Sequence, residues 1–193
     1  RMVEMADAEI GRILHALAAS PQADNTLVVF TSDHGEGVGE HRLDRKNFHY
    51  EAAIKVPLVW AWPGRILESA TDRTTLASGI DLMPTLCAYA GVAPPPLTTA
   101  QNLRPALEGH SSKNVRRFLP VEMSMRAVGR VVRSERFKYA VFAGEAVEQL
   151  FDLQLDPGET RNLVSEPSYE EIRREHRAAL GEWERRLQPA RGA

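Results

Sequence analysis

The sequence has one cysteine, almost no net charge and no long hydrophobic run, and each shortage excludes a kind of bond or partner. One cysteine cannot form an internal disulfide, and proteins without disulfides are more common in reducing compartments. The localisation is unknown from the sequence, with the cytoplasm slightly favoured over the periplasm. A net charge of −2 offers no basic surface, so no nucleic-acid partner is expected. No apolar run approaches the roughly twenty residues of a membrane span, so no membrane partner is expected either.

What the chain does contain is an ordinary globular composition, 43% apolar and 26% charged, over 193 residues. That length is enough to bury the core of one or two domains. Helical and strand patterns alternate in residues 1–95, which predicts an α/β fold. The helical patterns lie at 3–19 and 81–90, with Asp81 as the N-cap of the second, and apolar strand patterns lie at 26–30 and 58–62.

The second half of the chain has a different pattern. Residues 96–114 are rich in proline and polar residues and are expected to form a connector. Three strand-like runs and a long amphipathic helix follow, which predicts a small antiparallel sheet with a helix over residues 115–193. The runs span 126–133, 137–142 and 149–153, and the helix starts at a capping-box signature, Ser168 with Glu171.

Candidate ligands follow the first predicted strand directly. Asp33 and His34 come just past its carboxyl end, which is where open α/β sheets bind ligands. A carboxylate and an imidazole can bind one cation together, although Asp-His-Gly is also a common turn. Three glycines at alternate positions, beginning with Gly35, allow tight turns and a close approach to a ligand. Lys46 is near enough in sequence to bring a positive charge to the same place.

A series of short motifs then runs in a recognisable order through nearly the whole chain. They are Ser32-Asp33-His34-Gly35, Gly39-Glu40-His41, Lys46, Tyr50-Glu51, Val56-Pro57-Leu58, Trp62-Pro63-Gly64, Asp81–Leu86 with Ala90-Gly91, Phe137-Lys138-Tyr139, Leu150–Leu153, Asp156-Pro157 and Glu159. In this ordered set the chain resembles the formylglycine-dependent sulfatases of the alkaline-phosphatase-like superfamily. It is most similar to members with an Asp-His metal pair, such as iduronate, choline and heparan-type sulfatases.

The resemblance implies a fold and a set of roles. The fold is the carboxyl-terminal part of a sulfatase-like α/β sandwich plus a small antiparallel sheet-and-helix subdomain. Asp33 and His34 become ligands of a divalent metal, with Ca²⁺ favoured and Mn²⁺ or Zn²⁺ as alternatives. Lys46 becomes the lysine that binds the sulfuryl group and offsets the charge that develops there. His41 either lies near the substrate or is structural.

One motif of the family is missing. Sulfatases carry Cys-x-Pro-Ser-Arg or its Ser form, whose first residue becomes the formylglycine nucleophile, and no such motif occurs here. Cys87 lies in an apolar helical segment and is expected to be a small core residue. We therefore expect the carboxyl-terminal portion of a longer sulfatase, with no catalytic nucleophile of its own. This chain alone is expected to be inactive and to associate through uncovered apolar faces, those of Leu27, Val29, Leu58 and Trp60.

Alternatives stay open at this stage. A phosphonate or phosphate diester hydrolase of the same superfamily uses a similar Asp-His pair, and a non-catalytic remnant or binding module would keep the fold without turnover. The expected partner is a sulfated small molecule or glycan, and oligomerisation is possible.

Other residues are assigned from their surroundings: Glu51 as a structural anchor, His49 as a surface or packing residue, Asp44 and Arg45 as candidates for facing the substrate, and Arg133, Arg136 and Lys138 as solvated strand residues, of which one could border the pocket.

Overall fold

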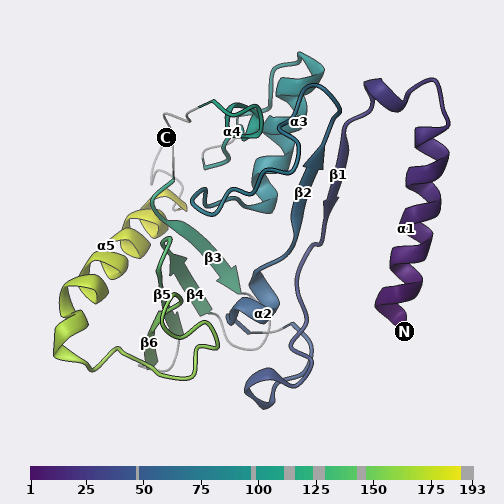
Figure 1. The fold of residues 1–193 in the computed structure, drawn as a ribbon. Coiled ribbons are helices and arrows are strands. Elements are labelled where there is room, and N and C mark those ends of the chain that lie inside the picture. The colour runs from purple at the N-terminus through teal and green to yellow at the C-terminus, as the bar shows by residue number, and fades with distance from the viewer. Residues whose placement is uncertain (47, 97–98, 111–115, 124–128, 143–146, 188–193) are drawn as a thin grey trace.

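The computed structural model describes residues 1–46, 48–96, 99–110, 116–123, 129–142 and 147–187 (Figure 1). It contains a two-stranded sheet with helices in the first half of the chain and a four-stranded sheet with one long helix in the second. This is the mixed α and β architecture that the sequence predicts. Within the described residues, no helix is long and apolar enough to cross a membrane.

The first half is built around an antiparallel pair of strands. Its elements are α1 (Met2–Ala18), η1 (Ala23–Asn25), β1 (Val28–Thr31), η2 (Glu40–Arg42), α2 (Glu51–Ile54), β2 (Leu58–Ala61), η3 (Gly79–Asp81), α3 (Leu82–Ala90) and α4 (Arg104–Leu107). Thr31 pairs with Leu58, so the carboxyl end of β1 lies beside the start of β2. The predicted helix at 3–19 and both predicted strands are confirmed to within a few residues.

One face of this sheet is open, which corrects the prediction of buried strands. The cross-strand pair Phe30 and Val59 is 46% and 55% exposed, whereas Val29 and Trp60 on the opposite face are half-buried. Side chains point alternately to the two faces of a sheet, so these two cross-strand pairs lie on opposite faces. The uncovered apolar face is therefore the Phe30–Val59 face, not the face of Val29 and Trp60. Helix α1 stands beside β1 without a buried residue (Figure 1).

Helix α3 starts differently from the prediction. The 3₁₀ turn η3 precedes it, so Ser78 makes the capping box and Asp81 closes it from inside the turn. Asp81 is fully buried, and its carboxylate accepts hydrogen bonds from Arg116 at 2.8 Å and from the Gln101 N–H at 2.7 Å. The helix ends at Gly91 in the left-handed conformation, as expected, and Cys87 within it is half-buried. Asp81 thus joins α3 to later parts of the chain rather than capping the helix.

The second half is an antiparallel meander covered by a helix. Strands β3 (Leu119–Met123), β4 (Gly129–Arg133), β5 (Phe137–Phe142) and β6 (Val147–Asp152) lie in this order, and η4 (Pro167–Tyr169) leads into α5 (Glu170–Leu187). Helix α5 covers one face of the sheet (Figure 1). The core under it consists of Val132, Tyr139, Leu150, Leu163 and Leu180.

The predictions for this half are largely confirmed. Strand β5 has the predicted bounds, β6 starts two residues earlier than predicted, and residues 126–128 of the first predicted run lie outside the described residues. Strand β3 was missed, because a short strand that contains Pro120 gives a weak pattern and fits only at a sheet edge, where it lies. Helix α4 lies within the stretch predicted as a connector.

Candidate functional site

Three polar side chains converge just beyond β1. Lys46 Nζ lies 2.6 Å from His34 Nε2, and Asp33 Oδ2 lies 3.4 Å from the same nitrogen. The other ring nitrogen of His34, Nδ1, lies 2.8 Å from the carbonyl oxygen of Gly35. A carbonyl oxygen can only accept, so Nδ1 carries the proton and Nε2 keeps its lone pair. This is the arrangement of a metal-binding histidine, whose free nitrogen faces the ligand site.

The charge of Asp33 suits a cation site. Its side chain is 82% exposed, and its Oδ1 accepts a hydrogen bond of 2.9 Å from the His34 N–H. Desolvation alone raises the pKa of the Asp33 carboxyl, but that backbone hydrogen bond and the nearby His34 and Lys46 bring the pKa below its usual value. Asp33 is therefore ionised at neutral pH and presents an uncoordinated oxygen, Oδ2, next to His34.

Short helix α2 holds this loop in place. The Gly35 N–H donates to the Ala53 carbonyl at 2.7 Å, and a Cβ on Gly35 would lie 1.9 Å from the Ala52 carbonyl oxygen. A Cβ on Gly37 would lie 2.5 Å from the ring of Phe48. Gly35 and Gly37 are therefore needed for close packing against α2 and Phe48, and their approach to a ligand stays a prediction. Only Gly39, with a φ of +95°, serves a tight turn.

Gly35→Ala is expected to destabilise the fold by about 1–3 kcal/mol, the usual cost of forcing extra atoms into a packed site. The added methyl group would meet the backbone of α2, which cannot turn away as a side chain can. Urea unfolding measures the change. Gly181→Ala is the matched control, because a Cβ there meets nothing within 4 Å and the helix gains propensity. Equal stability of the two variants would contradict the close contact.

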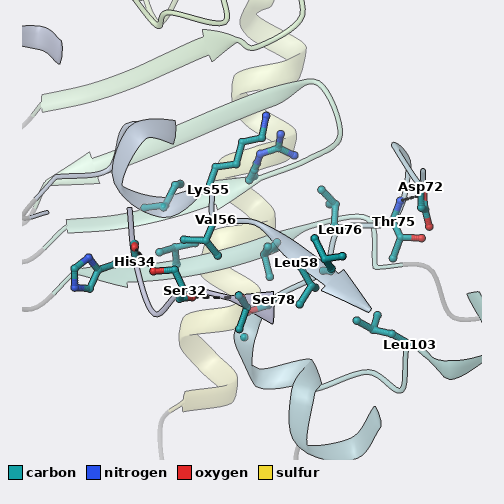
Figure 2. A pocket seen from close by; sticks show the side chains of 18 of the residues that line it. Ser32, His34, Lys55, Val56, Leu58, Asp72, Thr75, Leu76, Ser78 and Leu103 are labelled. Atoms are coloured by element: carbon teal, nitrogen blue, oxygen red, sulfur yellow. Dashed lines mark hydrogen bonds between the residues drawn. The ribbon is translucent and has the colours of Figure 1, made fainter. Parts of the chain in front are cut away.

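The three side chains lie at one end of a cavity of about 970 Å³. Figure 2 shows its lining: Ser32 and His34 come from the segment after β1, Val56 comes from the segment between α2 and β2, and Leu58 is the first residue of β2. Leu76, Ser78 and Leu103 line it farther from the charged group. The cavity thus combines a charged end with apolar walls, which is typical of small-molecule sites.

Some predicted residues do not join this group. His41 stacks on Tyr50, with ring centroids 3.6 Å apart and planes 7° from parallel, and it does not line the cavity. Asp44 and Arg45 are exposed, lie 3.9 Å from each other and do not line the cavity either. The geometry gives His41 a packing contact, and its role towards a substrate stays a prediction.

Lys138 corrects the sequence analysis. It was predicted to be solvated, but it is fully buried, because β5 is a central strand with Tyr139 facing α5 and Lys138 facing α2. Lys138 Nζ donates to the His49 carbonyl at 2.8 Å and forms ion pairs with Glu51, at 3.3 Å, and with Glu159. Glu159 Oε2 in turn accepts from the Glu51 N–H at 2.6 Å. The only hint in the sequence was a lysine between two aromatic residues.

The neighbouring arginines differ from the prediction in separate ways. Arg133 borders the cavity and lies 3.4 Å from Glu51, so it is the one of the three that reaches the pocket. Arg136 is half-exposed but fixed by Asp152, with Nη2 donating to Oδ2 at 2.6 Å. Glu51 is a structural anchor, as expected, because its backbone N–H donates to Glu159 in the loop after β6 and its carboxylate pairs with Arg133 and Lys138 of the second sheet.

His49 is a packing residue, one of the two alternatives that the sequence left open. It is 3% exposed, and its ring lies 4.3 Å from that of Tyr50 and 4.9 Å from that of Phe142. Burial, together with the charge of Lys138, lowers the pKa of His49 to about 4. The imidazole is therefore neutral at physiological pH and adds no charge beside the site.

Comparison with known proteins identifies the family of this chain. The profile of the family described as N-sulphoglucosamine sulphohydrolase, C-terminal, matches residues 39–186. The chain belongs to the sulfatase family. It is 34% identical over 187 residues to a Δ4,5-hexuronate-2-O-sulfatase of Bacteroides thetaiotaomicron, an alignment that covers 93% of this chain and 39% of the relative.

Solved structures share the fold of this chain. One neighbour, solved in complex with its substrate D-glucosamine-2-N,6-O-disulfate, has a TM-score of 0.89 and 27% identity, and the match covers 95% of this chain and 39% of that one. The phosphonate monoester hydrolase of Agrobacterium radiobacter has a TM-score of 0.82 and 30% identity, over 96% and 40% of the two chains. The chain therefore spans about two fifths of the length of these relatives.

Sulfatases of this superfamily generally use a divalent metal and a formylglycine. In this sulfatase chain, the described residues contain no group of three or more metal-binding side chains of the His, Cys, Asp or Glu type. Asp33 Oδ2 and His34 Nε2 nevertheless fit as a partial set, because they lie 3.4 Å apart and Nε2 has a lone pair, which accepts a hydrogen bond from Lys46 in this structure. A complete site for a hard cation needs further oxygen ligands.

Proposed function

We propose that this chain forms one side of the active site of an enzyme that hydrolyses sulfate esters. The observation that carries the proposal is the convergence of Asp33 Oδ2, His34 Nε2 and Lys46 Nζ at the charged end of one cavity. Two of these groups can bind a cation, and the third is itself a cation. A sulfuryl group needs both, because its oxygens are negatively charged and become more so during hydrolysis.

The roles divide among the three residues. Asp33 and His34 would hold the divalent metal, with Ca²⁺ favoured over Mn²⁺ and Zn²⁺ because the carboxylate is a hard ligand. Such a metal, when bound, acts as a Lewis acid on an oxygen of the ester. Lys46 would offset charge on another sulfuryl oxygen. The apolar walls around Leu58 and Leu76 would exclude water from the body of the substrate.

The nucleophile is the part that these residues do not supply. The sequence has no Cys-x-Pro-Ser-Arg or Ser-x-Pro-Ser-Arg motif. In our proposal the formylglycine and the remaining metal ligands therefore lie outside these 193 residues. Two of the relatives act on sulfated sugars, which makes a sulfated glycan or a small sulfate ester the proposed substrate class.

A phosphonate monoester hydrolase is the second candidate, favoured by one observation. The solved enzyme from Agrobacterium radiobacter matches 96% of this chain at a TM-score of 0.82. A phosphonate monoester and a sulfate ester both place anionic oxygens around a tetrahedral centre, and an Asp-His-Lys group suits either. The residues that separate the two substrates are not among the three that converge here.

A substrate panel on the complete enzyme tests the function. Purified enzyme is assayed with an aryl sulfate, a phenyl phosphonate monoester and an aryl phosphate diester, and then with glucosamine 6-sulfate and an unsaturated uronic acid 2-sulfate. We expect the highest kcat/KM for a sulfate ester, loss of that activity on treatment with a chelator, and recovery on addition of Ca²⁺. A higher kcat/KM for the phosphonate monoester would favour the second candidate. Turnover that survives complete metal removal would contradict both.

A further inference from the structure

Helix α2 links the two arms of the candidate site. On one side, the Ala53 carbonyl accepts from the N–H of Gly35, the residue next to His34. On the other, the chain that carries Lys46 runs directly into α2, and Phe48 in that segment is buried against Gly37. A displacement of α2 would therefore act both on the loop that carries His34 and on the segment that carries Lys46.

This helix cannot hold its position alone. It has four residues, and its N-terminal boundary residue, Tyr50, makes no side-chain capping hydrogen bond. Helices this short are not stable without tertiary contacts. Ala53 is its single buried residue, so apolar packing offers little. The contacts that fix α2 must come from outside it.

The second sheet supplies them through buried charges. Lys138 on β5 donates to the carbonyl of His49, and Glu159, in the loop after β6, accepts from the N–H of Glu51. These two hydrogen bonds hold backbone atoms at the start of α2, and the Lys138–Glu159 ion pair connects the two side chains that make them. Both side chains are almost completely buried, at 0% and 2% exposure.

A buried ion pair is weak evidence for added stability, and its directed hydrogen bonds point to a role in geometry. Replacing a buried ion pair with well-packed apolar residues is often neutral or stabilising, because desolvation offsets the attraction between the charges. Burial accordingly raises the pKa of Glu159, while Lys138 and the Glu51 N–H oppose that rise. Apolar residues would fill the same space, but they would not direct hydrogen bonds to particular backbone atoms of His49 and Glu51.

We propose that Lys138 and Glu159 are positioning residues, which fix α2 and thereby set the distance between the His34 and Lys46 side chains. This inference rests on the proposed function, because it concerns the same site. Neither residue lines the cavity, so neither touches the substrate. The small carboxyl-terminal sheet would thus take part in catalysis through α2 rather than through groups of its own.

The test uses carboxylate-to-amide and lysine-to-methionine variants of the complete enzyme. Glu159→Gln keeps an acceptor for the Glu51 N–H but loses the charge, Glu159→Ala loses both, and Lys138→Met keeps the volume without the donor. Asp152→Asn is the matched control. Asp152 is equally buried in the same subdomain, but its hydrogen bonds go to Arg136 and to the N–H groups of Gln154 and Leu155.

Three quantities are measured for each variant at a temperature where unfolding curves show it folded: the dissociation constant of calcium titrated into metal-free enzyme, kcat and KM. We expect Glu159→Ala and Lys138→Met to weaken calcium binding and to lower kcat by about 10–100-fold, the scale for residues that orient a metal ligand. Glu159→Gln should recover part of both losses. Asp152→Asn should change neither by more than about twofold, although its unfolding midpoint should fall.

The outcomes separate this inference from the function on which it rests. Wild-type calcium affinity and kcat in folded Glu159→Ala and Lys138→Met would overturn the positioning role alone. The same losses in Asp152→Asn would also overturn it, because they would reflect general destabilisation. If Glu159→Ala does not fold, Glu159→Gln and Lys138→Met decide by the same criteria. A wild-type enzyme without calcium binding or sulfate ester hydrolysis would overturn both proposals.

Discussion

Replacing Lys46 with alanine in the complete enzyme is expected to lower the turnover of a sulfate ester by about 10²–10³-fold, the scale for losing one preorganised electrostatic contact. Lys46 Nζ lines the charged end of the cavity, 2.6 Å from His34 Nε2. Among the residues that the structure describes, no carboxylate lies close enough to form an ion pair with it. Its charge is therefore free to act on an anionic substrate.

Metal binding should survive the same substitution. The Lys46 ammonium donates to the lone pair of His34 Nε2, which is the lone pair that a metal would use. Removing the lysine therefore removes a competitor, and the affinity for calcium should stay equal or increase. This contrast separates Lys46 from the proposed metal ligands, whose loss should abolish binding.

Lys55→Ala provides the control for this prediction. Lys55 also borders the cavity and is exposed, but it lies after α2 and apart from the three converging side chains. Steady-state kinetics of both variants, together with metal content, are the measurements. A Lys46→Ala enzyme with the turnover of Lys55→Ala would make Lys46 an ordinary surface lysine.

The local parts of this site could be predicted because they depend on neighbouring residues. A short apolar strand ends at Thr31, and the two residues that follow Ser32 carry ligand chemistry. Lys46 lies close to them because the loop that follows folds back towards the end of β1. The run of aromatic and apolar residues likewise gave the bounds of β5 correctly. Patterns of this kind survive folding because they are set by the geometry of single elements.

The support behind the site could not be predicted in this way. Glu51 and Glu159 are 108 residues apart, and no periodicity links them. A lysine such as Lys138 is expected at the surface, because burying an unpaired ammonium is expensive. Its burial becomes favourable only when the carbonyl of His49 and the carboxylate of Glu159 meet it. That meeting is a property of the tertiary fold and not of any segment.

The wrong prediction of Asp81 as a helix cap has a related cause. An aspartate before an apolar helix is a standard capping signal, and the helix does begin there. The prediction omitted a preceding 3₁₀ turn and the distant Arg116, which together draw the carboxylate inwards. A side chain suited to a local cap can bind a long-range partner instead, and here the buried arginine is the stronger partner.

Replacing Asp33 with alanine is expected to remove the bound metal and, with it, nearly all activity. Asp33 supplies one of the two proposed metal-ligand atoms, so its loss leaves only the imidazole nitrogen of His34. Losing a direct carboxylate ligand should weaken calcium binding by more than the about 10–100-fold that is typical of losing an indirect partner. Elemental analysis of the purified variant and titration with calcium measure the change.

The fold should tolerate this substitution, which makes the result interpretable. The Asp33 side chain is 82% exposed, and within the described part of the chain its hydrogen bonds go only to Ser32 and to the His34 N–H. Asp44→Ala is the matched control, because Asp44 is 92% exposed in the same loop region and does not line the cavity. Both variants should unfold at nearly the wild-type urea concentration. If Asp33→Ala retained as much metal as Asp44→Ala, the cation could not be held by the Asp33–His34 pair, and the site would have to be sought elsewhere along the cavity.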